Sequence, residues 1–195
     1  WMVHQLSDTA ATSFNESVSL TIRGTLDHDL LFSSLNDVVA RHDALRARFS
    51  KNGSSFRIAE GSAPTPEIID LRGEANVDKA LSAFLSKDAH RPVDLISGPP
   101  IRATLVRLTD DKHVFVLTAH HIVCDGWSFN TVINDLAAIY SARISQSDPD
   151  LAAAPSFAAY AQSDTTRTAT QETRDYWADI LSNVPDLPNL PTDRP

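Results

Sequence analysis

The feature that most constrains the fold of this chain is a pair of largely apolar segments on either side of a short polar turn. The two segments are residues 101–108 and 113–120, and Asp110, Asp111 and Lys112 lie between them. This arrangement is typical of a β-hairpin. Apolar side chains occupy both alternating positions of the second segment, which predicts a strand that is covered on both faces.

Apolar periodicity places further strands and helices around this hairpin. The alternation of Val18, Leu20 and Ile22 with polar residues predicts a half-buried strand. Ser128 is a good N-cap for the helix that follows the hairpin. Short strands are also expected at residues 45–49, 55–59 and 68–71, and helices at residues 27–41, 77–89, 156–163 and 170–181. This order predicts an α/β (α+β) two-layer sandwich, with a mixed β-sheet flanked by helices.

Composition excludes several classes of protein. The 195 residues are 42% hydrophobic, enough for a sizeable core, and the formal net charge of −8 argues against a nucleic-acid partner. No apolar run is long enough to span a membrane. The single cysteine, Cys124, excludes an internal disulfide and is typical of the reducing cytoplasm. Because the chain opens at Trp1 rather than at a methionine, we expect a piece of a longer cytoplasmic polypeptide.

The segment best suited to chemistry joins the hairpin to the next helix and reads HHIVCDG, from His120 to Gly126. An imidazole has an unperturbed pKa of about 6.5, which suits proton transfer near neutral pH. Neighbouring side chains of a strand point to opposite faces, so we expect one of His120 and His121 to face a cavity while the other is held in the scaffold. Asp125 and Gly126 would shape the turn. The start of the next helix could help to stabilise an oxyanion.

Other chemistries fit this segment less well. A zinc site would combine the two histidines with His113 and Asp125, but their spacing matches no common zinc motif, so we expect no metal. Ser128 lacks the GxSxG turn of serine hydrolases. Cys124 stands among apolar residues, where a thiol is more often inert and buried than nucleophilic.

The pattern HHxxxDG over residues 120–126 resembles the signature of the condensation domains of nonribosomal peptide synthetases. Residues 1–6 resemble the tail of the family's first core motif, and residues 41–49, RHDALRARF, resemble the second, RHExLRTxF. Residues 92–99 are similar to the PFDLxxGP stretch, and residues 155–161 are a weaker match to YxDYAxW. These matches follow the family's order and cover nearly the whole chain.

The resemblance implies a domain of two lobes, each similar in fold to chloramphenicol acetyltransferase, with the active site in a tunnel between them. The start of the first motif and every motif after the fourth are absent. We therefore expect residues 1–184 to form the N-terminal lobe and the proline-rich residues 185–195 to cross toward a missing C-terminal lobe. The isolated lobe is expected to be inactive.

The activity implied by the resemblance is amide formation between an acyl or peptidyl thioester donor and an aminoacyl acceptor. Both substrates would be carried on the 4'-phosphopantetheine arms of partner carrier proteins, and the lobe itself would bind no cofactor. The expected partners are the donor and acceptor peptidyl carrier proteins, the C-terminal lobe and the neighbouring synthetase domains.

The resemblance also assigns roles to residues. His121 would be the catalytic residue, acting as a base or positioning the amine, while His120 would be structural. Asp125 would hold the loop through an ion pair with Arg41 or, preferably, with Arg46. The candidate site residues are His120, His121, Asp125 and Gly126, with Arg41 and Arg46 as structural support.

Related activities on the same fold remain as alternatives. Epimerisation domains have a similar histidine motif but continue differently after the aspartate, whereas DGWS here looks more like a condensation domain. Heterocyclisation domains carry DxxxxD in place of the histidine pair. Starter-type and ester-forming relatives are harder to separate. A non-catalytic module that recruits carrier proteins would usually lack His121 or Gly126, which are both present.

Overall fold

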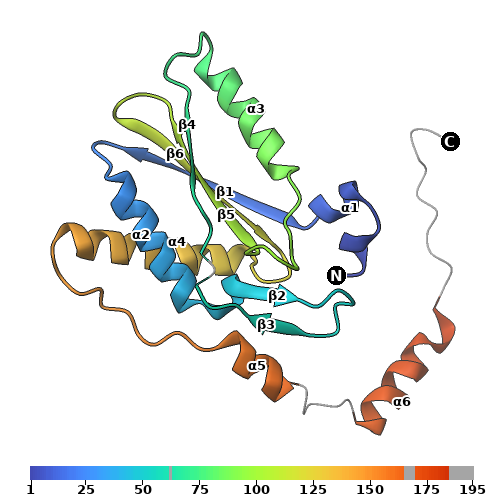
Figure 1. Ribbon diagram of the computed structural model, residues 1–195. Coiled ribbons are helices and arrows are strands. Elements are labelled where there is room, and N and C mark those ends of the chain that lie inside the picture. Colours follow the sequence, from blue (N-terminus) through green and yellow to red (C-terminus); the bar gives the residue numbers. More distant parts are fainter. Residues whose placement is uncertain (62, 165–169, 185–195) are drawn as a thin grey trace, which may run out of the picture. The chain divides into compact units, whose positions relative to one another are not determined.

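Figure 1 shows the computed structural model of the chain, which describes residues 1–61, 63–164 and 170–184. Its internal contacts divide it into two units, residues 1–159 and residues 160–195. The predicted crossover at residues 185–195 lies outside the described residues. Among the helices described, none is both long and apolar enough to cross a membrane.

The first unit is built on a four-stranded mixed sheet with the strand order β1-β6-β5-β4. The predicted hairpin is confirmed, because β5 and β6 are antiparallel neighbours. Strand β1 pairs antiparallel with β6, and β4 pairs parallel with β5. The strands are β1 (Asn15–Arg23), β4 (Glu67–Asp70), β5 (Ile101–Arg107) and β6 (Lys112–His120). A separate two-stranded sheet consists of β2 (Ala47–Phe49) and β3 (Phe56–Ile58).

Helices cover both faces of the four-stranded sheet (Figure 1). Phe115 and Leu117 of β6 pack against α2 (His28–Arg41) and α4 (Gly126–Ile144), whereas Val114 and Val116 belong to the core beneath α3 (Val77–Ala89). All residues of β6 after the first are buried, as the apolar pattern predicted. Burying each large apolar side chain contributes about 1.5–3 kcal/mol.

The predicted mixed sheet flanked by helices is confirmed, and α3 adds a third layer to the two that were expected. The remaining short elements of the first unit are η1 (Val3–Gln5), α1 (Asp8–Thr12) and η2 (Asp43–Arg46). Helix α5 (Phe157–Asp164) crosses the boundary between the units. The described part of the second unit continues with α6 (Gln171–Ile180) and η3 (Leu181–Asn183).

The start of α4 differs from the prediction. Its N-cap is Asp125 rather than Ser128, so the helix begins at Gly126. One carboxylate oxygen of Asp125 accepts hydrogen bonds from the backbone N–H and the hydroxyl of Ser128, at 2.8 and 2.7 Å. Both Asp and Ser are favoured caps, and the cap that the structure selects is the earlier of the two.

Candidate active site

Residues 120–126 form the histidine turn, which lies where β6 ends, between the start of β1 and the start of α4. His120 is the last residue of β6 and pairs with Asn15, the first residue of β1. Its backbone N–H donates to the Pro100 carbonyl at 3.0 Å, and that of His121 donates to the Phe14 carbonyl at 2.8 Å. The two segments that flank β6 therefore fix the backbone of the turn.

The side chain of His120 is enclosed in the scaffold. The residue is only 2% exposed, and its Nδ1 accepts a hydrogen bond from the backbone N–H of Ile122 at 3.1 Å. Because Nδ1 is an acceptor, the proton of the neutral ring lies on Nε2, which is 3.2 Å from Nδ1 of His4. Burial, together with the nearby positive charge of His4, lowers the pKa of His120 to about 4. His120 is therefore neutral at pH 7.

The side chain of His121 has a different environment and is about half exposed, at 47%. Its Nδ1 lies 2.8 Å from a carboxylate oxygen of Glu16 and 3.1 Å from the carbonyl of Cys124. Both partners are acceptors, so Nδ1 carries the proton. The other ring nitrogen, Nε2, has no hydrogen-bond partner within the part of the chain that the structure describes. The two histidines thus diverge, as strand alternation predicted.

Glu16 is a neighbour of the candidate site that sequence reasoning missed. It lies in β1 opposite Ala119, so it shares a sheet face with the residue two positions farther along, His121. The predicted strand began only at Val18, which left Glu16 outside the sheet. Extending that strand by a few residues and pairing it antiparallel with the hairpin would have revealed the contact.

Asp125 does not form the ion pair that was expected. Its exposed carboxylate caps α4 through Ser128, and these hydrogen bonds hold its pKa below the ordinary value. No salt bridge joins it to Arg41 or Arg46 among the described residues, so that prediction is wrong. Because the carboxylate already occupies the positive end of α4, the structure does not support the oxyanion site expected there.

Gly126 is the first residue of α4 and does not take a positive φ angle. A Cβ atom added at this position would meet nothing within 4 Å. The turn itself therefore does not require glycine, and this part of the expectation is wrong. Close approach of a substrate to the Gly126 backbone stays a prediction.

Arg41 supports the framework through a carboxylate other than that of Asp125. Its Nε donates to Asp135 of α4 at 2.8 Å, and the same carboxylate oxygen lies 2.8 Å from Nε2 of His42. Asp135 is only 9% exposed. Arg41 also donates to the carbonyl of Ala152. The residue therefore joins the end of α2 to the middle of α4 and to the segment that follows α4.

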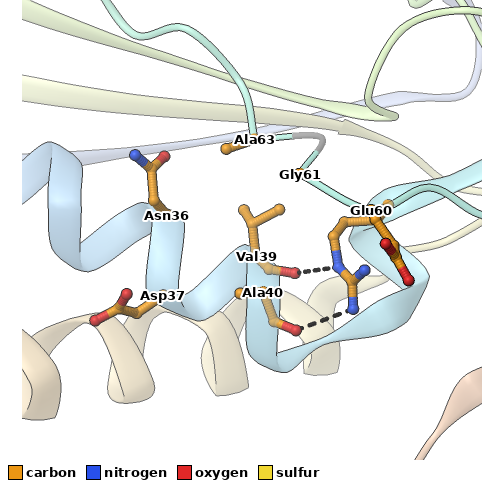
Figure 2. Close-up of a pocket in the computed structure, with 8 residues that line it drawn as sticks. Asn36, Asp37, Val39, Ala40, Glu60, Gly61 and Ala63 are labelled. Carbon is orange, nitrogen blue, oxygen red and sulfur yellow. Dashed lines mark hydrogen bonds between the residues drawn. The ribbon is translucent and has the colours of Figure 1, made fainter.

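Arg46 binds backbone carbonyls instead of a carboxylate. Its guanidinium donates to Val39, Ala40 and Ala59 at 3.0–3.1 Å, and dashed lines in Figure 2 mark the first two bonds. These bonds tie the end of α2 to the segment after β3. Arg46 also lines an open cavity of about 460 Å³, and no residue of the histidine turn lines that cavity. The cavity is lined by Asn36, Asp37, Val39, Ala40, Arg46, Glu60, Gly61 and Ala63 (Figure 2).

A smaller cavity of about 150 Å³ is lined by one residue of the histidine turn, Val123, and by residues of the helix that follows it. Its lining residues are His42, Ala44, Leu45, Val123, Ser128, Thr131 and Val132.

Burial raises the pKa of the Cys124 thiol to about 12, which makes it a poor nucleophile at neutral pH. No three carboxylate, imidazole or thiol groups within the described residues come together in a way that could hold a metal ion.

Comparison with known proteins identifies relatives of the whole chain. The family model described as Condensation domain matches residues 1–195. The chain is 36% identical to Malpibaldin synthetase of Mortierella alpina, with all of the chain and 4% of the relative covered. It is 33% identical to the Dimodular nonribosomal peptide synthase of Bacillus subtilis (strain 168), with 99% of the chain and 8% of the relative covered.

Solved structures share the fold. The starter condensation domain of rhizomide synthetase RzmA matches with a TM-score of 0.84 and 25% identity, over 95% of this chain and 46% of that one. A chain of the complex of the X-domain and OxyB from teicoplanin biosynthesis matches with a TM-score of 0.81 and 28% identity, over 100% of this chain and 44% of that one. The chain thus spans less than half of either solved protein. With the family model matching from end to end, the chain belongs to the condensation-domain family of nonribosomal peptide synthetases.

Proposed function

We propose that this chain is the lobe that carries the catalytic histidine of a peptide-bond-forming condensation domain. The observation that carries the proposal is the state of His121. The Glu16 carboxylate and the Cys124 carbonyl lie beside its Nδ1, whereas Nε2 has no hydrogen-bond partner among the described residues and the ring is about half exposed. A ring nitrogen that is accessible and free of protein partners can accept the proton of an attacking amine.

The proposed reaction joins two tethered substrates. The acceptor's α-amine attacks the donor's thioester carbonyl, the C–N bond forms, and the donor leaves as a thiol. A thioester is already activated, so the domain mainly has to bring two ends together and move one proton. His121 takes that proton at Nε2, or orients the amine by accepting its hydrogen bond there. His120 stays neutral and holds the turn in place.

The whole activity needs parts beyond this chain. We propose that a second lobe supplies the other wall of the substrate tunnel, and that donor and acceptor carrier proteins deliver substrates on 4'-phosphopantetheine arms. No cofactor would be held by this lobe itself. The reaction would take place in the cytoplasm, a compartment in keeping with a single buried thiol. The isolated chain would be inactive, and turnover by the chain alone would contradict this part.

The direct test uses the polypeptide extended through the second lobe. It is incubated with one donor-loaded and one acceptor-loaded carrier protein, and the acceptor is followed by intact-protein mass spectrometry. A mass gain equal to the donor acyl group supports condensation. No gain with several matched donors would overturn the proposal. Hydrolytic release of the product, followed by chiral and ester-selective analysis, separates amide formation from epimerisation and from ester formation.

A second candidate is a module that recruits a partner enzyme without catalysis. It is favoured by the similarity to a chain of the complex of the X-domain and OxyB, which shows a protein of this fold bound to another. His121 and Gly126 argue against it, because such modules usually lack one of them. Retention of carrier binding with no mass gain in any substrate pair would support recruitment.

A further inference from the structure

The carboxylate of Glu16 makes the shortest contact recorded for the His121 ring, at 2.8 Å from Nδ1. Resting on the function proposed above, we infer that Glu16 is a positioning residue for the reaction. In this role it fixes the Nδ1–H form and the orientation of His121, so that Nε2 faces the amine.

The fold holds both partners of this contact at defined positions. The two residues that precede Glu16 are themselves anchored. The side-chain N–H₂ of Asn15 donates to the carbonyls of Ala89 and Arg91, each at 2.9 Å, and the Phe14 carbonyl accepts from the His121 backbone. Glu16 and His121 are therefore brought together by the sheet.

The contact acts on the proton of Nδ1 in a way that the backbone acceptor alone does not. The Cys124 carbonyl is also an acceptor, at a longer distance of 3.1 Å. A negative charge this close to an imidazole N–H attracts its proton more strongly than a neutral carbonyl does. The Glu16 carboxylate lies closer to Nδ1 than the Cys124 carbonyl does and carries a negative charge, so it adds to the preference for the Nδ1–H form.

The same contact should contribute little to folding. The side chains of Glu16 and His121 are 36% and 47% exposed, and ion pairs this open to solvent are weak contributors to stability. A residue that affects the reaction but not the stability differs from a structural one. This difference separates a positioning role from a merely structural role.

Glu16 participates in the step in which the amine nitrogen bonds to the thioester carbonyl carbon and the carbon–sulfur bond breaks. The proton leaves the nitrogen for Nε2 of His121 and then passes to the departing thiolate sulfur. Glu16 keeps its charge throughout and takes up no proton, because it only holds Nδ1–H.

The test compares Glu16→Gln, Glu16→Asp and Glu16→Ala with wild type in the extended polypeptide. We expect the initial rate of acceptor mass gain to fall about 10-fold in Glu16→Gln, which loses the charge, and about 100-fold in Glu16→Ala, which loses the whole contact with Nδ1. Glu16→Asp keeps the charge and should lose less than Glu16→Gln. Glu74→Gln, an exposed loop residue away from the site, is the matched control and should keep the wild-type rate.

Urea unfolding of the same variants completes the rate comparison. Equal stability of Glu16→Gln and wild type supports positioning, whereas a loss of stability that accounts for the loss of rate would overturn it. Wild-type rates in both Glu16→Gln and Glu16→Ala would also overturn it. In that case, loss of acyl transfer in His121→Ala would show that the proposed function itself still stands.

A second measurement tests the role of Glu16 without turnover. If no product forms, that result counts against the proposed function, and this measurement still decides the inference about Glu16. Nitrogen NMR of the ¹⁵N-histidine-labelled chain at alkaline pH reports which ring nitrogen of His121 carries the proton, with His121→Gln identifying the signal. We expect the Nδ1–H form in wild type and growth of the Nε2–H form in Glu16→Ala. The Nε2–H form in wild type, or no change in the variant, would overturn the inference.

Discussion

Protonation of His120 should make the chain sensitive to acid, and the structure sets the size of the effect. The ring is 2% exposed, its Nδ1 accepts from the Ile122 N–H, and its Nε2 faces His4. Burial first, then the positive charges of His4, the N-terminus and His121, lower its pKa to about 4 from an ordinary value of 6.5. Charging His120 therefore means desolvating an imidazolium and losing the hydrogen bond that Nδ1 accepts.

The direction follows from proton binding in the two states. The unfolded chain takes up this proton near pH 6.5, while the folded chain resists it down to about pH 4. Between these values the unfolded state binds more protons, so the free energy of unfolding falls as the pH falls. The neutral form of His120 contributes about 3 kcal/mol to the free energy of unfolding at high pH, and all of this contribution is lost below pH 4. About 2 kcal/mol of it is lost between pH 8 and pH 5. Above pH 7 the contribution is complete.

The assay is urea unfolding at pH 8, 6.5 and 5, followed by circular dichroism, for wild type and for His120→Gln. Glutamine can still donate to His4 but does not titrate. We expect the variant's loss of stability from pH 8 to pH 5 to be smaller than that of wild type by about 2 kcal/mol. His90→Gln, which changes an exposed histidine, should leave the wild-type dependence intact. Parallel curves for wild type and His120→Gln would refute the reasoning.

Three further predictions concern the framework and the thiol. Asp135→Asn should lower the free energy of unfolding in urea by about 3–5 kcal/mol, because it removes the negative partner of the Arg41 guanidinium from a largely buried ion pair. Asp37→Asn removes the partner of Arg143 from a more exposed ion pair and should lower the same free energy by less than about 1 kcal/mol. Asp125→Ala should destabilise the chain far less than Asp135→Asn, and Asp125→Ser should recover most of that loss, since this carboxylate is an exposed helix cap; a loss as large as that of Asp135→Asn would restore the ion-pair interpretation. Cys124 should resist iodoacetamide at pH 8 and react only when urea unfolds the chain, because burial raises its pKa to about 12; rapid alkylation of the folded chain, seen by mass spectrometry, would contradict this.

Local patterns predicted much of the fold. The apolar character of β6 on both faces predicted two cores, and the structure places Phe115 in one and Val116 in the other. The short strands predicted at residues 45–49 and 55–59 are present as β2 and β3, and the turn between them contains Gly53 with a positive φ of 69°. Such features depend on residues close together in sequence, where period and turn chemistry determine the backbone.

The contacts of the candidate site were harder to predict because they join distant segments. Glu16 reaches His121 through the register of β1 with β6, and the predicted strand, which begins three residues late at Val18, conceals the pair. Arg46 was expected to bind Asp125, but three backbone carbonyls near the end of α2 and after β3 satisfy its guanidinium. Asp125 instead caps α4. Because Asp125 and Ser128 are both good capping residues, sequence spacing alone does not decide which of them caps the helix.

The most direct test of the central claim is the initial rate of acyl transfer to the acceptor carrier in wild type and in His121→Ala, both extended through the second lobe. We expect His121→Ala to lower the rate by about 10²–10⁴-fold, the usual contribution of general acid–base catalysis, while its affinity for both carrier proteins and its stability stay close to wild type. A His121→Ala variant that transfers the acyl group at the wild-type rate would contradict the assignment of the chemistry to this histidine.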